Sequence, residues 1–128
     1  MSDKFTVEII SPDQTILKQE TSEVIIPSFE GQMGILNNHI PLITFLRPGN
    51  ITIKAEGEKK YYVEEGTVEF SNNNLLILSS TAKDVNNLDK TQINDLIQKA
   101  EANLNAQSTD KERYVASYKL ETLKEISQ

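Results

Sequence analysis

Residues 24–49 read VIIPSFEGQMGILNNHIPLITFLRPG, and this stretch decides which fold the chain can adopt. It holds three of the five glycines and three of the four prolines among the 128 residues. Glycine opens backbone conformations that other residues avoid, and proline fixes φ and removes a backbone donor. The stretch therefore specifies a backbone shape. Its predicted shape-setting loop residues are Gly31, Gly34, Pro41, Pro48 and Gly49.

Short runs of alternating apolar and polar residues lie on both sides of this stretch, for example residues 5–9 (FTVEI) and 67–70 (TVEF). Alternation of this kind is typical of strands with one buried face. Turn signals separate the runs, at Ser11-Pro12-Asp13, Pro27-Ser28, Pro48-Gly49-Asn50, Glu56-Gly57-Glu58 and Ser71-Asn72-Asn73-Asn74. Because no helical pattern interrupts them, we predict an antiparallel β-sandwich or flattened barrel of about eight to ten strands.

The pattern changes at Leu88, in a part of the chain that has neither glycine nor proline. Asp89 with Gln92, and Thr109 with Glu112, have the spacing of helix N-caps and capping boxes, while residues 105–108 suit a helix end. We predict an antiparallel helical hairpin of about seventeen residues per arm. Its apolar stripes are Ile93, Leu96, Ile97, Ala100 and Leu104, then Val115, Tyr118, Leu123 and Ile126.

The change of pattern divides the chain into a predicted β-sandwich, residues 1–87, and a predicted helical hairpin, residues 88–128. Two amphipathic helices expose too much apolar surface to stand alone, so the stripes must pack on each other, on the sandwich or on another protein. A hairpin with two docking sites of similar free energy would act as a two-position switch.

Composition excludes several classes of protein. With no cysteine, the chain has no disulfide, no thiol nucleophile and no thiolate metal site. Its formal net charge of −6 disfavours binding to nucleic acid and direct insertion among anionic lipids. The sequence shows no signal peptide and no apolar run near membrane-spanning length, so we expect a soluble protein that stays where it is made.

Catalytic motifs are missing as well. His39 is the only histidine, and a structural or interface role suits it better than proton transfer, because no ionisable partner lies near it in the sequence. Glu30 and Glu64-Glu65 are more typical of a solvated or interface surface than of an acid/base pair. The Gly31-Gln32-Met33-Gly34 run lacks the Lys-Ser/Thr of a phosphate-binding loop. We therefore predict no catalytic residue, no cofactor and no metal.

The central stretch resembles the epsilon subunit of bacterial F-type ATP synthases. The family pattern is roughly Pro-Gly-x-Glu-Gly-x-x-Gly-x-x-x-x-His-x-Pro-Leu, followed by Lys/Arg-Pro-Gly. The matching residues are Pro27, Glu30, Gly31, Gly34, His39, Pro41, Leu42, Arg47, Pro48 and Gly49. The departures are Ser28, Gln32 and Asn37-Asn38.

The resemblance implies a non-catalytic rotor subunit of the central stalk, which couples the ring of c subunits to the gamma subunit during ATP synthesis and proton transport. It implies that Glu30, Gln32 and His39 contact the c ring. It also implies that the hairpin can extend toward the alpha/beta catalytic head and weakly inhibit ATP hydrolysis. The expected location is peripheral, on the cytoplasmic face of the bacterial inner membrane.

Some members of this family bind ATP through an Ile/Leu-Asp-x-x-Arg-Ala motif, whereas residues 88–93 here read LDKTQI. The Arg and the Ala are both absent, so no useful ATP site is expected. Two other functions stay open from the residues alone. One is a stand-alone sandwich that binds a ligand or peptide and dimerises through its helices. The other is a small hydrolase using His39 with Glu30.

Overall fold

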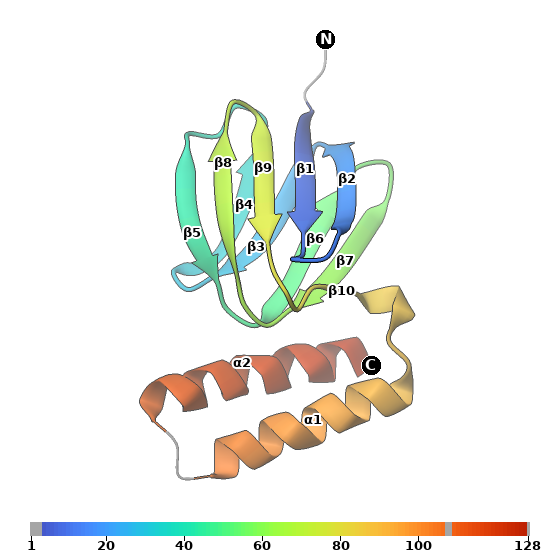
Figure 1. Ribbon diagram of the computed structural model, residues 1–128, viewed down its shortest axis with the longest axis vertical. Coiled ribbons are helices and arrows are strands. Elements are labelled where there is room, and N and C mark those ends of the chain that lie inside the picture. Colours follow the sequence, from blue (N-terminus) through green and yellow to red (C-terminus); the bar gives the residue numbers. More distant parts are fainter. Residues whose placement is uncertain (1–3, 107–108, 128) are drawn as a thin grey trace.

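The computed structural model describes residues 4–106 and 109–127. Within these residues a β-sandwich of ten strands precedes a short 3-10 helix and two α-helices (Figure 1). The strands are β1 (Phe5–Ile10), β2 (Thr15–Thr21), β3 (Glu23–Ser28), β4 (Gly31–Leu36), β5 (Leu42–Leu46), β6 (Gly49–Lys54), β7 (Glu58–Val63), β8 (Gly66–Ser71), β9 (Asn74–Leu78) and β10 (Lys83–Asp84). The helices are η1 (Val85–Asn87), α1 (Lys90–Asn105) and α2 (Asp110–Ser127). The predicted fold class is confirmed.

The strands form two layers (Figure 1). One layer has the order β5-β8-β9-β1-β2, and the other has β10-β7-β6-β3-β4. A single pair, Ser28 opposite Leu46, joins β3 to β5 and so links the layers. Every strand pair is antiparallel except β1 with β9, which pair in parallel from Thr6 opposite Asn74 to Ile10 opposite Leu78. Turn signals report only consecutive strands, so the sequence could not predict this parallel pair.

The core lies between the two layers. Inward residues of alternating pattern are almost fully buried, among them Val7, Ile26, Ile51, Phe70 and Ile77, each at most 1% exposed. Burying one such side chain stabilises the fold by roughly 1.5–3 kcal/mol. The sandwich therefore has a dry, continuous core, which makes it a stiff body.

The predicted turn at Pro27-Ser28 is wrong, because both residues belong to β3. The turn follows at Phe29 and Glu30. Ser28 closes it from the strand end: its hydroxyl donates to the carbonyl of Gly31 at 2.7 Å and accepts from the amide of Glu30 at 3.1 Å. Gly31 has φ +120°, a conformation that favours glycine. Proline is tolerated here because Pro27 lies next to the end of its strand.

Gly49 is required where β6 crosses close to β3. A Cβ at this position would lie 2.5 Å from Cβ of Pro27. We expect Gly49→Ala to lower the free energy of unfolding by at least about 1 kcal/mol, because the overlap forces one strand to move. Urea denaturation measures the change. Gly57→Ala is the matched control, since no atom lies within 4 Å of its added Cβ. Equal losses in the two variants would contradict the prediction.

Both predicted helix starts are confirmed. The carboxylate of Asp89 accepts from the amide of Gln92 at 2.8 Å, and the side chain of Gln92 accepts from the amide of Asp89 at 3.0 Å. The side chains of Thr109 and Glu112 cap α2 in the same reciprocal way. Helix α1 has 16 residues and α2 has 18, close to the predicted seventeen. The predicted helix end at residues 105–108 agrees with α1 ending at Asn105, while residues 107 and 108 lie outside the described residues.

The apolar stripes face the inside of the hairpin and the sandwich. Figure 1 shows α2 between the sandwich and α1. The buried members of the stripes are Ile93, Ala100 and Leu123. The half-buried members are Leu96, Ile97, Leu104, Val115, Tyr118 and Ile126. The hairpin is therefore docked in this structure, with α2 as the contacting arm.

Candidate functional site

The end of the sandwich that faces α2 carries a chain of stacked side chains. Phe29, in the β3–β4 turn, stacks on Tyr114 of α2 with ring centroids 5.7 Å apart. Tyr114 meets Tyr118, one helical turn later, edge-on at 4.7 Å. The guanidinium of Arg47 lies 3.8 Å from the ring centroid of Tyr118. We call these four residues, Phe29, Arg47, Tyr114 and Tyr118, the aromatic latch.

Arg47 is held in place from the sandwich side. It lies in the connection between β5 and β6, and its Nε donates to the carbonyl of Ser28 at 2.9 Å. Its backbone amide donates to the carbonyl of Pro27 at 2.9 Å. These sandwich contacts fix the guanidinium of Arg47 independently of α2. Its contact with the Tyr118 ring therefore costs little side-chain conformational entropy.

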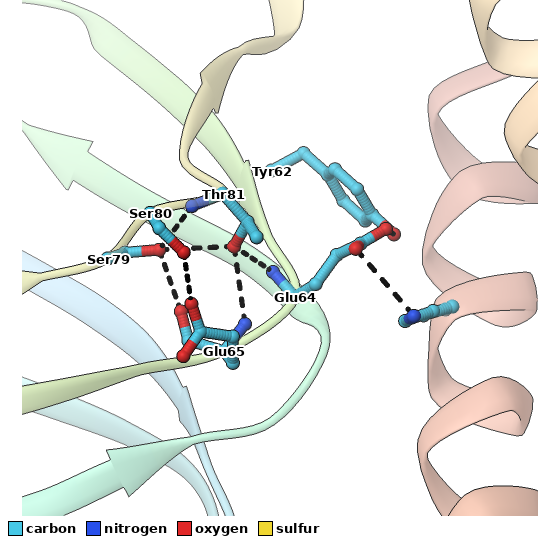
Figure 2. A network of polar contacts seen from close by, with 7 residues as sticks. Tyr62, Glu64, Glu65, Ser79, Ser80 and Thr81 are labelled. Carbon is cyan, nitrogen blue, oxygen red and sulfur yellow. Dashed lines mark hydrogen bonds and ion pairs between the residues drawn. The ribbon is translucent and has the colours of Figure 1, made fainter. Parts of the chain in front are cut away.

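A second contact joins α2 to the turn between β7 and β8. Nζ of Lys119 lies 3.6 Å from Oε1 of Glu64, and both side chains are about a quarter exposed, at 24% and 25%. The other carboxylate oxygen of Glu64 accepts from the hydroxyl of Tyr62 at 3.0 Å (Figure 2). Burial raises the pKa of Tyr62 far above its usual range, and the charge of Glu64 and its hydrogen bond raise it further. The hydroxyl therefore stays protonated and fixes the carboxylate that binds Lys119.

Figure 2 also shows how the β7–β8 turn is tied to the chain leaving β9. Oγ1 of Thr81 accepts from the amides of Glu64 and Glu65, at 2.9 and 3.3 Å. Oγ of Ser79 donates to the carbonyl of Glu65 at 2.7 Å, and Oγ of Ser80 donates to its carboxylate at 2.6 Å. These hydrogen bonds fix the backbone of Glu64 and the first part of the link to the hairpin relative to each other.

Between these contacts lies a polar cavity of about 210 Å³. Its lining includes Arg47, Asn50, Lys60, Glu121 and Glu125. Oδ1 of Asn50 is buried and has no hydrogen-bond partner among the described residues. The cavity is large and polar enough for water. The hairpin therefore docks through aromatic and charged contacts beside a polar cavity, which makes its docking weaker than the packing of a continuous core.

The three residues predicted to contact the c ring lie at two different ends of the sandwich. Glu30 is exposed in the β3–β4 turn, and Gln32, on β4, lines the cavity beside α2. His39 lies in the connection after β4, where its Nδ1 donates to the carbonyl of Ile40 at 2.7 Å and its ring meets Phe70 edge-on at 5.9 Å. The structure brings Glu30 and Gln32 together. It separates them from His39 by the length of β4, about 20 Å.

Sequence reasoning missed most of the latch. It selected Tyr118 for the apolar stripe and Arg47 as a match to the family pattern, but it did not pair them. The spacing of Tyr114 and Tyr118, four residues apart on one helix, was the available signal for a shared face. The partners on the sandwich come from distant turns, and no local pattern marks them.

Metal and membrane features are absent from the described part of the chain. Within residues 4–106 and 109–127, no three His, Asp or Glu side chains gather as metal ligands would. Over the same residues, neither long helix has the apolar length that crossing a bilayer requires.

Comparison with known proteins identifies the family. A family model described as "ATP synthase, Delta/Epsilon chain, beta-sandwich domain" matches residues 4–85. The ATP synthase epsilon chain of Pelagibacter ubique is 44% identical to this chain, over 99% of this chain and 100% of that protein. The epsilon chain of Dichelobacter nodosus is 37% identical, over 79% of this chain and 72% of that protein.

Solved structures agree on the fold. A chain in the cryo-EM structure of the Euglena gracilis mitochondrial ATP synthase, showing OSCP, F1 and the c-ring, superposes with a TM-score of 0.81 at 19% identity, covering 100% of this chain and 84% of that one. A chain of the Tetrahymena thermophila mitochondrial ATP synthase central stalk and c-ring gives 0.69 at 16% identity, covering 96% of both chains. Since the family model spans most of the chain and a full-length relative shares 44% of its residues, this chain belongs to the ATP synthase delta/epsilon chain family.

Proposed function

We propose that this chain is a non-catalytic rotor subunit of the F-type ATP synthase, which couples the c ring to the gamma subunit in the central stalk. The observation that carries the proposal is the 44% identity to an epsilon chain along essentially the whole of both sequences. The structures with the same fold come from assemblies of F1, the central stalk and the c-ring. A stiff sandwich with a dry core suits a part that must transmit torque without deforming.

We assign rotor binding and regulation to the two structurally different parts of the chain. Residues 1–87 form the proposed rotor-binding part, and residues 88–128 the proposed regulatory arm. Support comes from the β7–β10 pair and η1, which hold the chain on the sandwich as far as Asn87, and from the family match, which ends at residue 85. Leu88 alone lies between η1 and the N-cap Asp89, which supports a hinge of the proposed arm at this residue.

Glu30, Gln32 and His39 remain the proposed contacts to the c ring. Glu30 and Gln32 lie two residues apart along the chain and Gln32 lines the cavity beside the hairpin, whereas His39 lies beyond the other end of β4. The two groups therefore need separate tests. The subunit is proposed to lie on the cytoplasmic face of the bacterial inner membrane. Protein contacts must hold it there, because a net charge of −6 is repelled by anionic headgroups.

Purification from native membranes tests the rotor proposal. The expected result is co-purification of the full-length chain with gamma, the c ring and the alpha/beta head. Recovery as a free homodimer would instead support the stand-alone binding module. A turnover activity lost in His39→Ala would support the hydrolase.

We further propose that the extended hairpin weakly inhibits ATP hydrolysis. The basic residues of α2 that would bind the catalytic head are Lys111, Arg113, Lys119 and Lys124. Acidic residues on the same helix balance them, namely Asp110, Glu112, Glu121 and Glu125. Because these basic and acidic residues are equal in number, α2 carries no net positive charge, and its hold on another subunit should be weak.

Ending the chain after Asn87 is therefore expected to raise the ATPase rate of the reconstituted enzyme by less than about tenfold, or about 1.4 kcal/mol. The measurement compares the enzyme with full-length and shortened chains at equal occupancy. Equal rates would remove the inhibitory role and leave the coupling role untouched.

A further inference from the structure

The loop that carries His39 is tied to a neighbouring β-hairpin by two asparagines. The loop, residues 37–41, joins β4 to β5, and the hairpin joins β8 to β9 through Asn72 and Asn73. Both lie at the end of the sandwich away from the helices (Figure 1). The amide of Asn38 donates to Oδ1 of Asn73 at 2.8 Å, and Nδ2 of Asn73 donates to Oδ1 of Asn38 at 3.1 Å. We call this reciprocal pair of hydrogen bonds the asparagine clamp.

The backbone of both segments prepares the clamp. Asn38, Asn72 and Asn73 have φ values of 65°, 52° and 57°, in the left-handed region. Two consecutive residues of positive φ form the turn that suits a two-residue β-hairpin. Asparagine tolerates positive φ better than most other residues, and glycine tolerates it best. Glycine would keep these turns but has no side chain with which to form the clamp.

Asn73 is itself fixed to the sandwich. Its carbonyl accepts from the amide of Thr6, at the start of β1, at 3.1 Å. Asn73 therefore connects the loop that carries His39 to β1 as well as to the β8–β9 turn. Its own side chain is half-buried, whereas Asn38 is exposed. The clamp thus fixes an exposed loop to a stiff part of the sheet.

The clamp lies directly beside His39. The amide of His39 donates to the carbonyl of Leu36 at 3.1 Å and closes a turn around Asn38. The ring of His39 meets Phe70 edge-on, and its Nδ1 donates to the carbonyl of Ile40. Because a carbonyl oxygen can only accept, Nδ1 carries the proton, and the neutral ring offers Nε2 as a hydrogen-bond acceptor.

The surface around His39 carries no formal charge. Residues 36–41 (LNNHIP) and 71–74 (SNNN) contain no Asp, Glu, Lys or Arg, although the whole chain has a net charge of −6. Leu36 is 56% exposed and Ile40 is 74% exposed. The matching partner therefore presents a hydrogen-bond donor to Nε2 among apolar groups, and its binding here depends little on salt.

We infer that Asn38 and Asn73 are positioning residues for the rotor contact of His39: the clamp holds the loop so that Nε2 meets a donor on the c ring. This inference rests on the proposed function, which assigns His39 to the c ring. The physical reason is preorganisation. A loop that is already held in its bound conformation loses less conformational entropy when it binds.

Reassociation of the full-length chain with membranes that hold the rest of the enzyme but lack this subunit tests the inference. The measurement is the chain concentration that gives half-maximal ATP-driven proton pumping. Asn73→Gly is expected to raise this concentration about five- to tenfold, because both clamp bonds are lost and the loop must be ordered on binding. Asn72→Gly is the matched control. Glycine suits the positive φ of both positions, but Asn72 lies outside the clamp, so its variant should match the wild type.

His39→Ala separates positioning from simple stabilisation of the fold. Alone, it should raise the half-maximal concentration, because the contact to the ring is lost. Adding Asn73→Gly to His39→Ala should cause no further rise, since the side chain that the clamp positions is gone. The melting temperature, by contrast, should fall by the same amount when Asn73→Gly is added to either background.

The outcomes are distinguishable. Equal rises caused by Asn73→Gly with and without His39 would show a purely structural role and overturn the inference. Wild-type behaviour of Asn73→Gly beside an impaired His39→Ala would also overturn it, while the ring contact of His39 would stand. If His39→Ala matches the wild type, that contact and the inference fall together. If the wild-type chain restores no pumping, the rotor function falls with them.

Discussion

Raising the pH above 10 is expected to destabilise this chain through its buried tyrosines. Tyr62 is 1% exposed and Tyr61 is 5% exposed, and both lie on β7. Burial raises the pKa of each, with a further rise from the negative charge of Glu64 beside Tyr62 and of Asp84 beside Tyr61. In the unfolded chain both phenols titrate near pH 10. Folding therefore favours the protonated phenol.

The direction of the pH dependence follows from linkage. A group whose pKa is higher in the folded state contributes its full stabilisation below the unfolded-state pKa and loses it as the pH rises above that value. For Tyr62 the loss is about 1.4 kcal/mol for each pH unit above about 10, or about 2 kcal/mol by pH 11.5. Tyr61 adds to the loss in the same direction.

Urea unfolding of the wild type and Tyr62→Phe between pH 8 and 11.5 measures this effect. At pH 8 we expect the variant to be less stable by about 1 kcal/mol, because the hydrogen bond to Glu64 is lost. By pH 11.5 the order should reverse, since the variant has no phenol to ionise at this position. Tyr61→Phe should show a similar loss of slope. Parallel pH profiles for wild type and Tyr62→Phe would show that burial does not hold the phenol protonated.

Local signals in the sequence predicted the secondary structure well. The capping boxes at Asp89 and Thr109 and the alternation in residues 5–9 each involve neighbours along the chain, so their meaning does not depend on the rest of the fold. The Pro27-Ser28 signal failed because strand β3 continues through Ser28, and the turn begins only after this residue. Ser28 closes the turn by its hydrogen bond to Gly31. Proline and serine mark a turn nearby and do not fix which residue begins it.

Contacts between distant segments were beyond the sequence. The parallel pairing of β1 with β9 joins residues almost seventy positions apart, and the aromatic latch joins two sandwich turns to one helix. Strand β5 shows a subtler limit. Residues 42–46 (LITFL) carry no charge on either face, as in a strand that is buried on both sides. Only the structure shows that one of these faces is open.

Releasing the hairpin is expected to follow from a single substitution in the aromatic latch. In Tyr118→Ala the guanidinium of Arg47 loses the ring 3.8 Å away, and Tyr114 loses its edge-on neighbour at 4.7 Å. A cation–π contact contributes about 0.5–2 kcal/mol and an aromatic pair about 0.5–1.5 kcal/mol. The two losses together amount to about 1–3.5 kcal/mol, so the undocked population should rise by about fivefold to several-hundredfold. The caps at Asp89 and Thr109 are unchanged, so both helices retain their start signals.

Distances between two spin labels measure the release, and the absence of native cysteine makes labelling simple. Ser22→Cys on the sandwich and Glu101→Cys on α1 are both exposed. Tyr118→Ala should add a population with a longer or broader distance, whereas Ser117→Ala, an exposed neighbour on α2, should not. An unchanged distance distribution in Tyr118→Ala would show that the latch does not hold the hairpin.

The hairpin could inhibit hydrolysis when it is extended or support activity when it is docked. Shortening the chain does not distinguish these two roles by itself, but comparison with Tyr118→Ala does. If the extended hairpin inhibits hydrolysis, Tyr118→Ala should lower the ATPase rate of the reconstituted enzyme, because more of the arm is extended at any moment. Removal of residues 88–128 should raise the same rate. If the docked hairpin instead supports activity by bracing the sandwich through Arg47 and Glu64, both changes should lower it. Opposite signs for the two variants therefore identify a switch, and equal signs identify a brace.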